Sequence, residues 1–95
     1  MYKVVFTKQA LKDLENLKKS GISSKAKALV DVIRENPYQN PPRYEKLVGN
    51  LEGILSRRIN IQHRLVYQVY EGVFVQNEVE YQGTVKIIRM WTHYE

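Results

Sequence analysis

The apolar residues of the chain change their spacing after residue 36, and this change limits the folds that are open to it. From residue 7 to residue 36, apolar side chains recur every three or four positions, as they do on one face of a helix. From residue 55 onward they alternate with polar side chains, as in strands that have one buried face. Helices that come early and strands that come late predict an α+β fold, in which the helices cover an antiparallel sheet.

Two helices are expected in the N-terminal third. The first follows the N-cap candidate Thr7 and ends near Gly21, and the second begins at Ser23 or Ser24 and ends before Pro37. Each has a single apolar stripe, which is more typical of core packing than of a partner-binding groove. The stripes consist of Ala10, Leu11, Leu14 and Leu17 in the first helix and of Ala26, Leu29, Val30 and Ile33 in the second.

The remaining pattern predicts strands. A short strand is expected at 2–6, a hairpin at 55–61 and 64–69, and a last strand at 85–91. The segment 71–83 has a glycine near each end, and we interpret it as a surface hairpin or a long loop. The expected order is β-α-α-β-β-β: two N-terminal helices packed on a small twisted antiparallel sheet, in one domain that spans all 95 residues.

Composition narrows the class of partner. The chain has no cysteine, which excludes disulfides and thiolate metal sites, and its two distant histidines make another metal site improbable. The net charge of +5 favours a polyanion or an acidic protein as partner. We find neither a signal peptide pattern nor an apolar run of membrane-spanning length, so a cytoplasmic protein with no membrane contact is expected.

Arginines of the predicted hairpin are candidates for binding phosphate. Arg57 and Arg58 point to opposite faces of their strand, so at most one of them joins any given surface. Arg64 shares a face with Arg58 only if the hairpin places the two opposite each other. Like charges in that position are destabilising unless an anionic ligand or a carboxylate offsets them, which suggests a phosphate. The alternative is that these arginines only solubilise an exposed sheet face.

Three further residues could take part in proton transfer. His93 and Tyr94 follow the last strand, and histidine is the side chain best suited to donate a proton at neutral pH, although terminal residues are usually frayed. Glu45 lies just beyond a proline-rich stretch, where the alternative to a general base is a solvated surface carboxylate. His63 is interpreted as a turn residue of the hairpin.

Several motifs together resemble the YoeB (Txe) family of toxins, within the wider RelE-like group. The motifs are Asn50–Gly53, the Ser-Arg-Arg-Ile of 56–59, the His-Arg-Leu-Val-Tyr of 63–67 and the closing His93-Tyr94. The likeness extends over nearly the whole chain and is densest from Glu45 to Tyr67 and at His93-Tyr94. Members of this family are ribosome-dependent messenger-RNA endonucleases that are paired with antitoxins. Each motif alone is weak, but their combination at these spacings is specific.

The resemblance implies a role for each candidate residue. Glu45 would be the general base and His93 the general acid, Arg58 and Arg64 would stabilise the phosphate, and Tyr94 would orient the substrate. Metal-free transesterification of this kind yields a 2′,3′-cyclic phosphate and a 5′-hydroxyl, and it needs no cofactor.

The resemblance also implies partners and leaves alternatives open. Expected partners are messenger RNA in the ribosomal A site, the 70S ribosome and a YefM-like antitoxin, with Arg57 and Lys46 as further RNA contacts. Homodimers are known in the family, but nothing in this sequence fixes the oligomeric state. A non-catalytic toxin similar to ParE, which inhibits DNA gyrase, is one alternative, and a harmless basic RNA-binding domain is another.

The chain also departs from the family pattern. Val48 stands where the family often has a lysine, and Leu55 stands where an aromatic residue is common. Glu95 follows the terminal tyrosine, and the segment 71–83 looks extended. Whether Lys46 substitutes for the missing lysine stays open.

Overall fold

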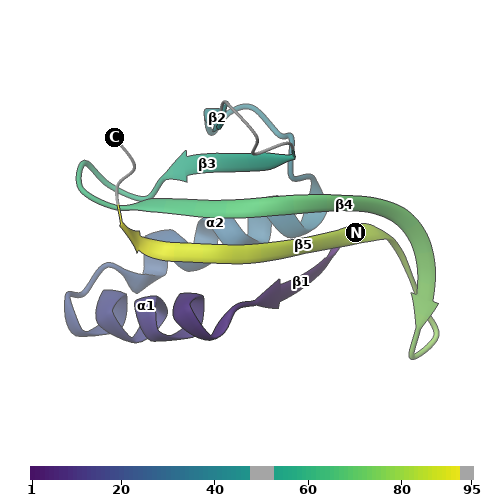
Figure 1. The fold of residues 1–95 in the computed structure, drawn as a ribbon, viewed down its shortest axis with the longest axis horizontal. Helices are drawn as coiled ribbons and strands as arrows, with labels where there is room; N and C mark the ends of the chain where they lie inside the picture. The colour runs from purple at the N-terminus through teal and green to yellow at the C-terminus, as the bar shows by residue number, and fades with distance from the viewer. Residues whose placement is uncertain (48–52, 93–95) are drawn as a thin grey trace.

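The computed structural model describes residues 1–47 and 53–92. They form two helices and a five-stranded sheet, with α2 behind the central strands in Figure 1 and α1 beside β5. The α+β class and the early position of the helices are confirmed. The elements are β1 (Lys3–Phe6), α1 (Lys8–Lys19), α2 (Ser23–Glu35), β2 (Tyr44–Lys46), β3 (Ile54–Arg58), β4 (Arg64–Gln76) and β5 (Val79–Thr92).

The sheet is mixed rather than antiparallel. Its strand order is β1-β5-β4-β3-β2, and β1 runs parallel to β5, with Lys3 opposite Thr84. The other neighbouring strands pair antiparallel. The expectation of an antiparallel sheet is therefore wrong at one edge. A parallel pair needs a long connection, and the helices and the other three strands provide it.

Thr7 is the N-cap of α1, as predicted. The N-cap of α2 differs from the prediction of Ser23 or Ser24. The Thr7 hydroxyl accepts a hydrogen bond of 3.0 Å from the backbone N–H of Ala10, and Gly21 follows α1 with a φ of 75° that favours glycine. At α2 the N-cap position is Ile22, whose side chain makes no capping hydrogen bond, and Ser23 is already helical. The helix depends instead on its apolar stripe, which packs into the core.

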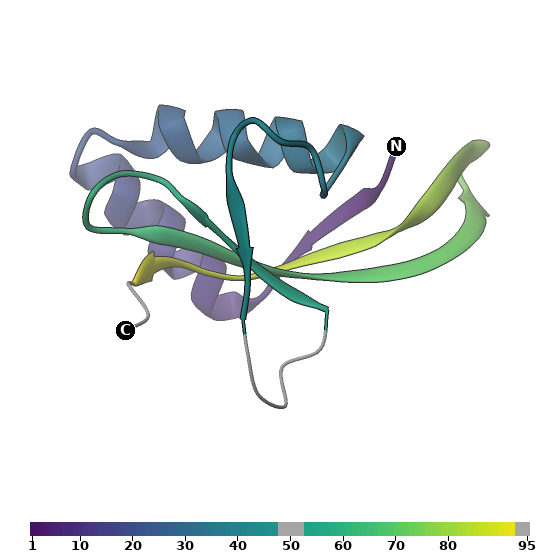
Figure 2. The ribbon, with the colours of Figure 1, turned by 90° about the horizontal axis from the view of Figure 1, so that it is seen from above.

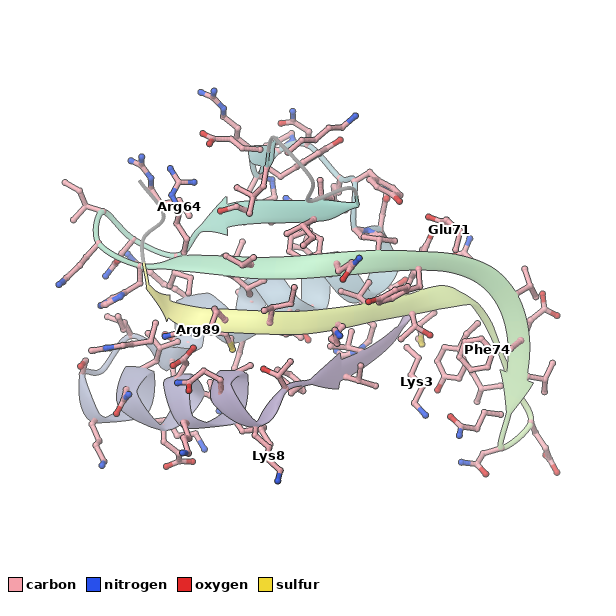
Figure 3. All side chains as sticks on the ribbon, viewed as in Figure 1. Lys3, Lys8, Arg64, Glu71, Phe74 and Arg89 are labelled. Carbon is pink, nitrogen blue, oxygen red and sulfur yellow. The ribbon has the colours of Figure 1, made fainter. Side chains whose placement is uncertain are left out.

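Asp13 is the buried charge that fastens α1 to β5. Its carboxylate accepts hydrogen bonds of 2.9 Å from the side chain of Arg89 and from the backbone N–H of Met90, and one of 3.0 Å from Gln9. Burial raises the pKa of Asp13, but these donors outweigh burial and hold the pKa below its ordinary value. Figure 3 shows Arg89 where α1 and β5 meet. The helix is thus fixed to the sheet by a satisfied ion pair as well as by apolar contacts.

The segment 71–83, interpreted from the sequence as a surface hairpin or a long loop, is the outer part of one long hairpin. The described part of β3 pairs with β4 no further than Gln68, and β1 pairs with β5 from Thr84 on, so the two strands continue beyond the sheet as a two-stranded arm (Figure 2). The rings of Phe74 and Tyr81 stack across the arm with centroids 5.1 Å apart. The arm contains three glutamates and neither lysine nor arginine.

The arm ends in a tight turn and begins at a close backbone contact. Asn77 and Glu78 both have positive φ, as in the hairpin turns that match the twist of paired strands. At the base of the arm, a Cβ atom on Gly83 would lie 2.3 Å from the backbone oxygen of Tyr70, so only glycine fits there. The carboxylate of Glu71 accepts hydrogen bonds from the hydroxyls of Tyr2 and Tyr38, which ties the base to the body of the domain.

None of the described helices is long and apolar enough to cross a membrane.

We expect Asp13→Asn to lower the free energy of unfolding by on the order of 3 kcal/mol near pH 7, because it removes one partner of a buried ion pair. The folded-state pKa of Asp13 is lowered, so the stability that its charge contributes is present above about pH 3.8 and is lost as the pH falls through the folded value. Urea unfolding of both proteins from pH 7 to pH 2.5 should show the difference shrinking in acid. Asp31→Asn, at an exposed carboxylate, is the matched control; a constant difference across this range would contradict the assignment.

Candidate active site

The register of β3 and β4 places Arg58 directly opposite Arg64, which is the pairing required for the two arginines to share a face. Arg64 lies at the start of β4, at the other end of that strand from the arm with Phe74 (Figure 3). Arg58 is exposed at the end of β3, whereas the side chain of Arg64 is only 19% exposed. The geometric condition on this pair is therefore met in the structure.

Glu45 joins the two arginines because β2 adds a third strand beside β3. Its register partner is Ser56, and one of its carboxylate oxygens lies 3.7 Å from Nη1 of Arg64. The other oxygen lies 3.9 Å from Nη2 of Arg43, two residues earlier in the chain. Nη1 of Arg64 also donates to Oγ of Ser56 at 3.4 Å. Glu45 therefore lies beside Arg43 and Arg64 in the structure.

These five side chains line a pocket of about 260 Å³: Arg43, Glu45, Ser56, Arg58 and Arg64. Three guanidinium groups and one carboxylate give it a positive balance. Its three polar contacts, at 3.4 to 3.9 Å, are longer than the 2.7 to 2.9 Å typical of charge-assisted hydrogen bonds. The donors are therefore gathered but only loosely engaged, which suits a phosphate that arrives with its substrate.

Arg43 and Ser56 were not anticipated as part of this site. Both could have been found from the alternation of side chains along a strand. Arg43 lies two residues from Glu45, and Ser56 lies two residues from Arg58. In an extended strand, such neighbours point to the same face. The signal was present, but it could be used only once the face of Glu45 and Arg58 was known.

Arg57 corrects one expectation. It was predicted to contact RNA, but its side chain has no exposed surface and its guanidinium donates to backbone carbonyls inside the molecule. The alternation of β3 explains the error, because Arg58 faces the pocket and Arg57 therefore faces the core. Lys46 is exposed on β2 but is not among the residues that line the pocket, so its contact with RNA stays a prediction.

His63 has a larger structural role than that of a turn residue. It lies in the turn before β4, is 5% exposed, and its ring stacks on Trp91 with centroids 4.0 Å apart. The side chain of Asn60 forms the turn by accepting hydrogen bonds from the backbone N–H groups of Gln62 and His63. The stack fixes the last part of β5 beside the start of β4.

The proposed acid and orienting residue, His93 and Tyr94, lie outside the described residues, as do Val48 and Glu95. The backbone of β5 leads to them at Thr92, which pairs with Arg64. Among residues 1–47 and 53–92, no cluster of three or more histidine, aspartate or glutamate side chains could hold a metal ion.

The chain is similar to known bacterial toxins. Residues 6–94 match the family model described as YoeB-like toxin of bacterial type II toxin-antitoxin system. A curated relative, toxin YoeB of Synechocystis sp., is 44% identical over 41 residues, which cover 43% of this chain and 48% of the relative. The matched residues of the chain thus span about half the length of this curated relative.

Solved structures are similar over nearly the full length. A YoeB/ParE toxin from Agrobacterium tumefaciens has a TM-score of 0.79 at 26% identity, with 97% of this chain and 99% of that chain covered. The YoeB dimer from Staphylococcus aureus has a TM-score of 0.76 at 30% identity, with 98% of each chain covered. A YoeB–YefM complex from the same organism has a TM-score of 0.69, also at 30% identity, with 99% of each chain covered.

The facing arginines lead to a testable expectation about stability. Because Arg58 and Arg64 are like charges on directly opposite positions, Arg58→Gln should raise the free energy of unfolding, by up to about 1 kcal/mol at low salt. The gain should fade in 0.5 M salt, which screens exposed charges. Chemical denaturation at both salt concentrations measures it, and Lys27→Gln, the same charge change on α2, is the control. A clear loss of stability would show that repulsion between the two arginine charges does not destabilise the fold.

Proposed function

Because the chain belongs to the YoeB-like toxins of bacterial type II toxin-antitoxin systems, we propose that it is an endoribonuclease that cleaves messenger RNA in the ribosomal A site. The observation that carries the proposal is the pocket in which Glu45 lies 3.7 Å from Arg64, with Arg43, Ser56 and Arg58 around it. A carboxylate beside several guanidinium groups provides a base and anion-stabilising donors in one place.

In the proposed reaction, Glu45 accepts the proton of a ribose 2′-hydroxyl. The 2′-oxygen of that ribose attacks the adjacent phosphorus at the same time. The bond between O2′ and phosphorus forms and the bond between phosphorus and O5′ breaks. His93 donates a proton to O5′, and Tyr94 orients the nucleotide. The products are a 2′,3′-cyclic phosphate and a 5′-hydroxyl, so the atoms and protons balance without a metal or a cofactor.

Arg64 and Arg58 act on the charge that builds up between these two proton transfers. The phosphorane carries more negative charge on its equatorial oxygens than the diester does, and preorganised guanidinium donors stabilise that difference. Arg64 suits this role because it is only partly exposed and is oriented by Ser56. Arg43 and Arg58 are more exposed, and they suit contacts with the flanking phosphates as well.

We also propose partners by analogy with the relatives. The Staphylococcus aureus protein has been solved with YefM, and a YefM-like antitoxin is the expected partner of this chain. An acidic segment on the antitoxin would suit a protein of net charge +5. The same relative has been solved as a dimer, and a homodimer is the expected free state. Translation places the proposed activity in the cytoplasm, with the 70S ribosome as the assembly that presents the message.

The test offers purified protein to messenger RNA on programmed 70S ribosomes and maps the cut by primer extension. We expect cleavage by the wild type, a loss of about 10² to 10⁴ in rate for Glu45→Gln and for His93→Ala, and a loss of about 10² to 10³ for Arg64→Ala. Glu35→Gln, which removes an exposed carboxylate at the end of α2, should cut at the wild-type rate.

Two results would count against the proposal. Uncut message with a toxic wild-type protein would favour a non-catalytic toxin similar to ParE. Inhibition of DNA supercoiling by gyrase would then be assayed. Uncut message with harmless overexpression would favour a simple RNA-binding domain. Wild-type cleavage by Glu45→Gln would keep the endoribonuclease but remove Glu45 as its base.

A further inference from the structure

Arg57 is a charged side chain with no exposed surface, which requires an explanation. All three of its guanidinium nitrogens donate hydrogen bonds. Nη1 donates to the carbonyl of Pro42 at 2.6 Å, and Nη2 donates to those of Pro37 and Gln39 at 3.0 and 2.8 Å. Nε donates to the hydroxyl of Tyr67 at 3.0 Å. Within the described part of the chain, no carboxylate is in ion-pair contact with it, so carbonyl dipoles and aromatic rings surround the charge.

The three carbonyls belong to one segment, residues 37–42, which leads directly into Arg43 and Glu45. This segment contains three prolines, which have no N–H group to donate. Its backbone can therefore be held mainly through its carbonyl oxygens, and a guanidinium is the one side chain that presents five donors in a fixed fork. Tyr67 strengthens the attachment, because its hydroxyl donates to the same Pro37 carbonyl at 2.7 Å.

The place of Arg57 on β3 connects this attachment to the pocket. Its two neighbours in the strand, Ser56 and Arg58, both line the pocket, while Arg57 points to the other face and holds the segment that delivers Glu45. The strand that carries Glu45 has only three residues, so its own ladder provides little restraint. Arg57 lies over the ring of Tyr44 as well, with its Cζ 5.1 Å from the ring centroid.

We propose that Arg57 is a positioning residue for the reaction: through the carbonyls of Pro37, Gln39 and Pro42 it sets Glu45 against Arg64. This inference rests on the proposed function. Without the fork, the fold can persist through its apolar core, but Glu45 loses its fixed distance from the phosphate-binding arginines. A displacement of about 1 Å in a catalytic group can cost on the order of 10² in rate.

The test compares two variants with a control of similar stability. Arg57→Lys keeps the charge, but a single ammonium cannot span three carbonyls in a fixed geometry. Tyr67→Phe keeps Arg57 but removes the hydroxyl shared with Pro37. Leu17→Ala, in the core of α1 and away from this segment, matches the expected loss of stability. All proteins are assayed at a temperature at which circular dichroism shows them folded.

The expected result is a split between rate and binding. In single-turnover cleavage on programmed ribosomes, Arg57→Lys should lower the rate at saturation by about 30-fold or more while half-saturation stays within about threefold. Tyr67→Phe should lose about 3- to 10-fold, and Leu17→Ala should keep the wild-type rate. A folded Arg57→Lys with the wild-type rate, or a loss no larger than that of Leu17→Ala, would overturn the inference. If Arg57→Lys does not fold, Tyr67→Phe decides by the same criterion.

A second measurement does not depend on catalysis. Amide hydrogen exchange should accelerate by about tenfold or more at Arg43 to Lys46 in Arg57→Lys, and much less in Leu17→Ala. If the wild type cuts no message, the proposed function fails, and the exchange pattern alone then decides whether Arg57 holds this segment. Unchanged exchange in a folded Arg57→Lys would overturn the inference even if the wild type is an active nuclease.

Discussion

The ladder between β4 and β5 is the interaction to which every other element is attached. It joins two strands of 13 and 14 residues, and β3 and β1 then pair on its two outer sides. The apolar side chains of its inner face form the core together with both helices, and Asp13 fixes α1 to β5. The pocket also depends on this ladder, because Arg64 begins one of its strands. An error in its register would therefore disturb the core and the site together.

β3 shows how one short strand can serve two functions through the alternation of its side chains. Arg57 and Arg58 are chemically identical neighbours, yet one is a buried donor to carbonyl oxygens and the other is an exposed cation beside a pocket. The difference arises only from the face to which each points. A similar division occurs at the turn before β4, where His63 packs on Trp91 while the next residue, Arg64, enters the pocket.

The fold class could be predicted from the sequence because helical and strand spacing are local properties. The pairing of β1 with β5 could not, because the direction of a four-residue edge strand is decided by tertiary packing. The glycines of segment 71–83 leave both a surface hairpin and a long loop open, and the pairing of β4 with β5, with the Phe74–Tyr81 stack across it, shows that the hairpin is correct. In the site, the register of Arg58 and Arg64 was stated as a condition, but parity alone could not tell which face lay inside. Arg57 was therefore assigned to the wrong side.

The arm makes the charge distribution of the molecule asymmetric. With +5 on the whole chain and three glutamates as the arm's only charged side chains, the remainder carries +8. The arm projects from one end of the sheet, and the pocket lies towards the other (Figure 3). In the field of a polyanion, the body is attracted and the arm is repelled, so the molecule experiences a torque as well as a net pull. Near any polyanion, this separation of charge favours an orientation in which the arm points away from the polyanion.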